Sequence, residues 1–238
     1  MNLTFFLRTS CWVFLGTLTL AFNQRSQVLL AHSGAANTPL FLAANHAAAT
    51  AWQELPTRAL AMALEGYQTL VEQGRLPKGA LLALADLSQP SDRERLYLLD
   101  PLHQEVLLTT LVAHGKNSGQ RYANLVSNSP QSHQSSAGFF LTRGVYQGKH
   151  GTALRLHGIE KGINDNALAR GIVLHAADYV NKGLANTRGW IGRSQGCPAV
   201  SPAISALLIE QLKDNHCLFV YHPSYKLQTT RLFNTFAP

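Results

Sequence analysis

The sequence predicts a mainly β fold, a β-rich α+β arrangement with a helix on each flank. Two observations lead to this class. The apolar runs in the middle of the chain are short and alternate with turn-rich pieces, which is typical of a β-meander. Only two segments, one before these runs and one near the C-terminus, repeat apolar residues at helical spacing. The chain is 46% hydrophobic and 14% charged, which is the composition of a folded globular protein.

The first flanking helix is predicted to begin near Pro56 and to end at Gly74. Leu60, Leu64 and Leu70 lie near helical spacing between these two residues. Proline is favoured in the first turn of a helix and glycine just after the last turn. We therefore expect an amphipathic helix of about 18 residues here.

Short apolar runs after this helix are predicted to be strands. They cover residues 80–85, 95–99, 105–113, 139–142, 153–157, 172–175 and 218–221. Residues 166–170 are expected to form a short helix. Ser201 is expected to cap the second flanking helix, and Pro202 to begin it.

Residues 115–138 differ from their neighbours, because they are rich in Ser, Asn, Gln and Gly and contain few large apolar side chains. Loops of this length in compact domains are usually functional or disordered. We expect this segment to line a cleft.

The N-terminal residues 1–31 are predicted to be an export signal. Arg8 precedes the apolar run 11–22, which is shorter than the roughly 20 residues that a membrane span needs. An uncleaved anchor is the alternative, because the positive start is weak. Residues 32–55 then form a loose lead-in, and residues 56–238 form a single domain that includes the first helix.

The charge of the chain restricts its partners. The formal net charge is +7, but no run of five or more basic residues occurs. A nucleic-acid-binding arm is therefore not expected, and a diffuse basic surface that faces an anionic polymer fits better. The residues do not indicate an oligomeric state.

Cys197 and His175 form the candidate catalytic pair. Cys197 lies in a glycine-containing turn, and His175 ends the apolar run 171–175. A free thiol has a pKa near 8.5, so a nearby imidazole is needed to activate it for acyl transfer. The backbone amides around the thiol, near Gly196 and Cys197, are expected to face a developing oxyanion.

The residues around this pair are candidates for substrate binding. Arg193 is predicted to lower the pKa of the thiol or to hold a substrate carboxylate. Ser194 is predicted to cap the turn or to orient the base. His157 ends another apolar run and is a second candidate imidazole.

Two other interpretations of Cys197 remain open. After export only Cys197 and Cys217 would remain, and these two could form a disulfide. Cys217, however, opens an apolar run and resembles a small buried hydrophobic residue. A zinc site that combines His150, His157 and His175 with the thiol is disfavoured, because no tight ligand spacing occurs.

Two segments carry a family resemblance. Residues 171–177 (GIVLHAA) and 192–200 (GRSQGCPAV) resemble the signature of the L,D-transpeptidases that remodel bacterial peptidoglycan. Residues 146–151, 154–156 and 162–167 are similar to the branch called murein L,D-transpeptidase catalytic domain proteins. Ser194, Gly196 and His175 match the family pattern.

The sequence also departs from that pattern. Gln195 stands where the better-known branch carries a histidine, and Pro198 and Ala199 stand where it often carries arginine or asparagine. Ala176 replaces the glycine that commonly follows the histidine. Substrate contacts made by those family residues therefore cannot be transferred to this chain.

The resemblance implies an L,D-transpeptidase-like β-sandwich or barrel in the periplasm or cell envelope. Cys197, activated by His175, would cleave the terminal D-alanine from a tetrapeptide stem through a thioester. An amine would then complete a 3→3 crosslink, or water would complete an L,D-carboxypeptidase reaction, with no metal or organic cofactor. A non-catalytic peptidoglycan-binding module and a metal-dependent envelope peptidase are the alternatives, and the acyl acceptor stays open.

Overall fold

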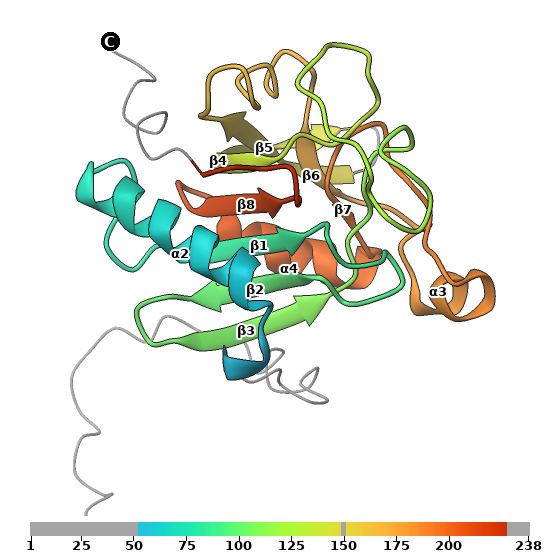
Figure 1. Cartoon of the computed structure of the whole chain (residues 1–238), viewed down its shortest axis with the longest axis horizontal. Helices are drawn as coiled ribbons and strands as arrows, with labels where there is room; N and C mark the ends of the chain where they lie inside the picture. Colours follow the sequence, from blue (N-terminus) through green and yellow to red (C-terminus); the bar gives the residue numbers. More distant parts are fainter. Residues whose placement is uncertain (1–51, 149–150, 228–238) are drawn as a thin grey trace, which may run out of the picture. The chain divides into compact units, whose positions relative to one another are not determined.

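A mixed sheet of eight strands forms the centre of the fold (Figure 1). The computed structural model describes residues 52–148 and 151–227, so the predicted export signal 1–31 and nearly all of the lead-in lie outside the described residues. The strand order is β3-β2-β1-β8-β4-β5-β6-β7. The strands are β1 Leu82–Asp86, β2 Leu96–Asp100, β3 Glu105–Thr110, β4 Gly138–Gly148, β5 Gly151–Gly158, β6 Val173–Ala176, β7 Ala199–Val200 and β8 Cys217–Tyr221.

Helices cover both faces of this sheet. Helix α2 (Thr57–Glu72) lies across one face and α4 (Pro202–Leu212) across the other (Figure 1). The 3-10 turn η1 (Trp52–Glu54) precedes α2, and α3 (Lys182–Arg188) lies between β6 and β7 in the chain. Strands covered on both faces are expected to be continuously apolar, and every residue of β1 and β8 is buried. No helix in the described ranges has both the length and the apolar character needed to cross a bilayer.

The α2 side of the sheet holds an aromatic core. Phe139 of β4 stacks on Phe219 of β8 with ring centroids 4.2 Å apart. Gly66 of α2 lies directly over Phe139, because a Cβ at Gly66 would come within 2.1 Å of the Phe139 ring. The missing side chain therefore lets α2 approach the sheet closely.

The α4 side holds the residues that alternate with these along the strands. Phe140 and Leu218 point to this side and pack with Leu208 and Leu212 of α4 in one cluster. Leu154 and Leu174, from β5 and β6, belong to the same cluster. β5 and β6, which carry part of the candidate site, are therefore anchored in the core on the α4 side of the sheet.

The mainly β prediction with flanking helices is confirmed, and both predicted flanking helices are present as α2 and α4. Each predicted strand is present, but the last one, β8, lies in the middle of the sheet between β1 and β4. It is parallel to β1, a pairing between segments far apart in the chain. No local pattern indicates this position.

Three local predictions need correction. Residues 166–170 form consecutive turns instead of a helix, because Gly171 with φ +66° ends them before a helical ladder can grow. Ser201 occupies the N-cap position of α4, but its side chain makes no capping hydrogen bond. Helix α3 was not predicted, although Asn181 caps it with a 2.8 Å bond from the Leu184 N–H.

Candidate active site

The pairing of β6 with β7 brings the two halves of the candidate pair together. These strands are parallel, and His175 is the register partner of Ala199, two residues after Cys197. On its other side His175 is paired with Ala153 of β5. Cys197 and His175 consequently line one pocket of about 410 Å³, which we call the Cys197 pocket. Its other lining residues are Tyr146, Gly148, Gly151, Ala153, Gly171, Val173, Tyr179, Arg193, Ser194 and Gln195.

Cys197 is half-buried in this pocket. Burial raises the pKa of its thiol, and the Val173 backbone and the Arg170 guanidinium oppose that effect only in part. The thiol donates a 3.6 Å hydrogen bond to the Gly171 carbonyl. Cys197 therefore rests as a thiol at neutral pH, and it needs a base before it can act as a nucleophile.

His175 is held in the orientation that a base requires. It is 8% exposed, and its Nδ1 lies 2.8 Å from the carbonyl oxygen of Ala176. A carbonyl can only accept a hydrogen bond, so Nδ1 carries the proton and Nε2 carries the lone pair. The ring is thus in the tautomer in which Nε2 can take a proton.

Ser194 braces the turn from inside. Its hydroxyl accepts a 3.0 Å bond from the Gly196 N–H and donates a 2.6 Å bond to the Cys197 carbonyl. Of its two predicted roles, the geometry matches the cap of the turn. Because the Gly196 amide is engaged in this way, it is not available to an oxyanion.

The backbone amides of Gln195 and Cys197, on either side of Gly196, differ from the Gly196 amide in their hydrogen bonding. Among the residues that the structure describes, the N–H groups of Gln195 and Cys197 have no hydrogen-bond acceptor. The Cys197 N–H also lies close enough to its own sulfur to lower the pKa of the thiol. Cys197 N–H is therefore the better donor for negative charge that develops beside the sulfur.

Gly196 has a conformation that only glycine adopts easily. Its φ is +128°, and a Cβ would lie 2.9 Å from the Gln134 carbonyl oxygen. The turn therefore packs directly against the polar loop 115–138. This contact gives Gly196 a structural role that its predicted oxyanion role does not include.

Arg193 ties the turn to the start of the same loop. Its guanidinium donates to the carbonyls of Lys116 and Gly119 at 3.1 and 2.9 Å and lies 5.3 Å from the centroid of the Trp190 ring. Arg193 also lines the Cys197 pocket. Its hydrogen bonds show that it holds the loop, a role that was not predicted.

Arg170 is a site residue that the sequence reasoning missed. Its guanidinium donates to Ser127 and Gln134 carbonyls, both at 2.6 Å, and to the hydroxyls of Ser132 and Ser136. One of its nitrogens would lie 3.3 Å from a Cβ at Gly196. Arg170 thus joins residues 127–136 of the polar loop to the turn 194–197 that carries Cys197, which we call the nucleophile turn. Its only sequence signal is its position just before the apolar run of β6.

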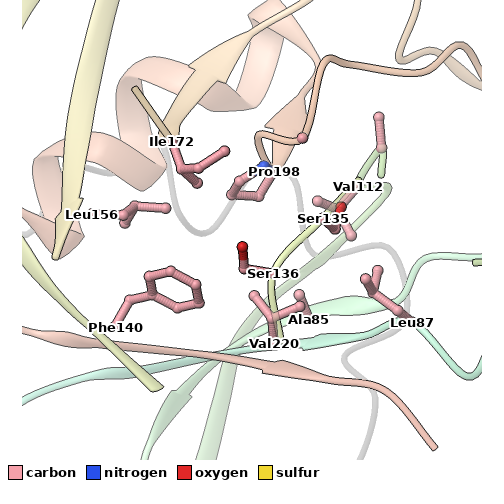
Figure 2. Close-up of a pocket in the computed structure, with 12 residues that line it drawn as sticks. Ala85, Leu87, Val112, Ser135, Ser136, Phe140, Leu156, Ile172, Pro198 and Val220 are labelled. Atoms are coloured by element: carbon pink, nitrogen blue, oxygen red, sulfur yellow. The ribbon is translucent and has the colours of Figure 1, made fainter. Parts of the chain in front are cut away.

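The polar loop lines cavities, as expected, but none of its residues lines the Cys197 pocket. Its residues instead line two other cavities, one of about 310 Å³ beside Tyr225 and one of about 10 Å³ behind the turn. Figure 2 shows the smaller cavity, where Phe140, Leu156 and Ile172 surround the Ser136 hydroxyl below Pro198. The turn that carries Cys197 consequently rests on an apolar floor.

His157 does not join the pair. It lies four residues from Ala153 on β5, about 13 Å along the strand. Burial lowers its pKa, and the charges of Arg143 and Arg75 lower it further. His157 is not among the residues that line the Cys197 pocket.

The structure bears on the two other interpretations of Cys197, a disulfide and a zinc site. Cys197 and Cys217 are both free thiols, and Cys217 is fully buried in β8. His150 lies outside the described residues. Within the described ranges, no three His, Cys, Asp or Glu side chains gather as a metal site would require.

Comparison with known proteins identifies the family of this chain. A model of the L,D-transpeptidase catalytic domain matches residues 51–221. Similar solved structures include an L,D-transpeptidase from Mycobacterium smegmatis, with 16% identity and a TM-score of 0.37, covering 60% of this chain and 59% of that one. An L,D-transpeptidase from Stackebrandtia nassauensis has 16% identity and a TM-score of 0.37, covering 68% and 66%.

The chain thus spans about three fifths of the length of the first of these structures. No curated protein sequence matches the chain significantly. The family model covers well over half of the chain, from just before α2 to the end of β8. The protein belongs to the L,D-transpeptidase catalytic domain family.

Proposed function

We propose that this protein is an exported cysteine acyltransferase that acts on the stem peptides of peptidoglycan. The observation that carries the proposal is the pairing of Cys197 and His175 in one pocket, with the imidazole in the tautomer of a base. Membership of the L,D-transpeptidase catalytic domain family supports the substrate class. The reaction takes place in the periplasm or cell envelope, where peptidoglycan lies.

In the first half-reaction, Nε2 of His175 takes the proton from the Cys197 thiol. The sulfur attacks the carbonyl carbon between the third stem residue and the terminal D-alanine. The Cys197 N–H stabilises the resulting oxyanion; one such donor is typically worth roughly 2.7–4 kcal/mol. As the C–N bond breaks, His175 returns the proton to the leaving amine, D-alanine departs and a thioester remains.

In the second half-reaction, His175 removes a proton from the acceptor, which attacks the thioester carbonyl. An amine of a neighbouring stem gives a 3→3 crosslink, and water gives the L,D-carboxypeptidase product. The thiolate leaves and regains its proton from His175. The groups needed for both steps are side chains and amides of this chain, so no metal or cofactor is invoked.

A non-catalytic peptidoglycan-binding module is the second candidate. The raised pKa of the Cys197 thiol favours it, because a buried, protonated thiol is a poor nucleophile unless the base acts. Incubation with a carbapenem distinguishes the two candidates. An activated Cys197 thiol opens the β-lactam ring of the carbapenem, and the protein gains the mass of the drug. A protein that gains no mass would support the binding module.

The decisive experiment is incubation of the protein with defined tetrapeptide muropeptides, followed by mass analysis of the products. We expect loss of D-alanine together with a crosslinked dimer or a tripeptide, and no activity for Cys197→Ala. Cys217→Ala is the matched control, because it removes a buried thiol that lies in the core of β8. Activity that survives Cys197→Ala would refute the proposal, and activity abolished by a chelator would favour a metal-dependent peptidase.

A further inference from the structure

Four basic side chains lie together beside the Cys197 pocket. Arg143 of β4 is the direct cross-strand partner of Arg155 of β5, and His157 lies two residues further along β5. Residues opposite each other, and residues two apart, share a face of the sheet. Arg75, just after α2, is joined to Arg143 through Asn215, which donates to the Arg75 carbonyl at 3.0 Å and accepts from the Arg143 guanidinium at 3.2 Å. We call these four side chains the cationic strip.

Arg143 lies close enough to Arg75 and His157 for its charge to act on both side chains. The charge of Arg143 lowers the pKa of Arg75, adding to the effect of burial. It also acts on His157, whose pKa is lowered first by burial and then by Arg143 and Arg75. Like charges directly opposite each other in a sheet are destabilising, and Arg143 and Arg155 are such a pair.

Nothing in the described part of the chain neutralises the two exposed arginines. Arg143 donates to the neutral amide oxygen of Asn215 at 3.2 Å, and Arg155 lies over the Tyr146 ring, 4.4 Å from its centroid. Neither guanidinium forms an ion pair with a carboxylate in the described ranges. Both therefore face solvent with their charge available to a ligand.

The cationic strip leads directly into the Cys197 pocket. Arg155 lies two residues from Ala153, about 7 Å along β5, and Ala153 is the cross-strand partner of His175. Tyr146, under the Arg155 guanidinium, lines the pocket itself. Among the described lining residues of the pocket there is no Asp or Glu. A ligand that is bound at Cys197 can therefore reach Arg155 on β5 and its cross-strand partner Arg143 on β4.

We propose that the cationic strip is a subsite that binds the free carboxylates of the peptide stem whose reacting end lies at Cys197, with Arg155 as the main contact and Arg143 as the next. The proposal rests on the proposed function for the identity of the ligand. The planar guanidinium matches a carboxylate in a bidentate pair. The position of the strip beside the reacting centre favours a group of the substrate itself over a separate polymer.

The test measures binding in the full-length Cys197→Ala protein, so that no turnover disturbs it. Arg155→Gln and Arg143→Gln are compared with Arg58→Gln, a matched loss of charge at an exposed arginine near the start of α2. The ligands are a tetrapeptide muropeptide with free carboxylates and the same muropeptide with its carboxylates amidated. We expect Arg155→Gln to weaken binding of the free acid about tenfold, because the substitution removes a charge-assisted hydrogen bond to the carboxylate.

Arg143→Gln is expected to weaken binding several-fold, and Arg58→Gln to leave it unchanged within about twofold. Amidation of the muropeptide should lower its affinity for the Cys197→Ala protein with an intact cationic strip. The amidated muropeptide should bind this protein and its Arg155→Gln variant with the same affinity. The thermal unfolding temperature of Arg155→Gln and Arg143→Gln should stay equal or rise at low salt, because a repulsion is relieved. A purely structural role would lower it.

The proposal is overturned if Arg155→Gln binds the free acid as tightly as the parent, or if it loses equal affinity for both ligands. The latter outcome would indicate general attraction to an anionic polymer. Failure of the proposed function has a different signature: the unsubstituted protein would release no D-alanine, whatever the binding results. The two hypotheses can thus fail separately.

Discussion

At the scale of single residues, the proposed chemistry depends on where the protons of Cys197 and His175 lie. Burial raises the pKa of the thiol, so the nucleophile is neutral at rest. The 2.8 Å contact of His175 Nδ1 with the Ala176 carbonyl leaves Nε2 as the basic nitrogen. In the proposed mechanism, reactivity therefore depends on proton transfer to the imidazole and not on a thiolate that is already present.

His175→Ala should lower the rate of acyl-enzyme formation by about 10²–10⁴-fold at neutral pH, the usual contribution of a general base. The rate should recover as the pH rises, since the raised pKa of Cys197 lies on the alkaline side. The measurement is the pH profile of carbapenem acylation by mass spectrometry. His103→Ala, an exposed histidine bound to Asp100, is the control and should keep the parent profile. An unchanged rate in His175→Ala would remove the imidazole from the mechanism.

Gly196 also acts at this scale. Gly196→Ala should destabilise the fold by about 1–3 kcal/mol through backbone strain, with further loss from the contact with the Gln134 carbonyl. Gly162→Ala is the matched control, because Gly162 has φ +77° but open space around its missing Cβ. Urea unfolding of the two variants would isolate the contact. Equal losses would mean that the approach to Gln134 does not constrain the turn.

At the scale of elements, the nucleophile turn depends on the polar loop behind it. Arg193 binds the start of the loop, Arg170 binds its second half, and the Ser194 N–H donates to the His114 carbonyl at 2.9 Å. The loop therefore acts as a scaffold for the turn. A segment with few apolar residues is kept ordered by these polar contacts.

Arg170→Gln should release residues 127–136, because it removes the donors to the Ser127 and Gln134 carbonyls. Hydrogen exchange in this segment should become faster. The pKa of Cys197 should rise further, because the Arg170 charge lowers it in the folded protein. A pH series of iodoacetamide alkylation would measure that shift, with Arg58→Gln as the control. A thiol pKa that stays at the parent value would separate Arg170 from the chemistry.

At the scale of the whole molecule, a buried cation governs stability toward acid. Arg95 is fully buried and donates to the carbonyls of Gln89 and Val112. Its guanidinium also lies 2.7 Å from His114 Nδ1. Burial, and next the Arg95 charge, lower the pKa of His114 to about 4.

The folded protein should lose stability as the pH falls from about 6.5 to about 4, because in this interval the unfolded chain binds a proton that folded His114 does not. The loss from His114 alone is on the order of 3 kcal/mol at the lower end. His216 and His222, whose pKa values burial also lowers, add to it with the same sign. The midpoints of urea unfolding between about pH 6.5 and about pH 4 would measure this loss of stability. His114→Gln should flatten the dependence, and a parent that is equally stable at both ends would contradict the assignment.

Local patterns were sufficient for much of the fold and for the candidate pair. Helical spacing predicts α2 and α4, and short apolar runs between turns predict the strands, because both signals are contained in neighbouring residues. The segments around Cys197 and His175 carry the family resemblance for the same reason. Asn181 and Gly189 also flank α3 as local caps, and this signal was overlooked.

The sequence by itself determined the mainly β class, the two flanking helices and the identity of the candidate nucleophile and base. Only the tertiary structure decided that β8 lies in the centre of the sheet, that Arg170 and Arg193 brace the turn, and that Arg143 and Arg155 meet beside the pocket. It also shows that the Gly196 N–H, an expected oxyanion donor, is engaged by the Ser194 hydroxyl. The physical reason is that these features arise from contacts between residues far apart in the chain, whose register depends on how the whole sheet pairs.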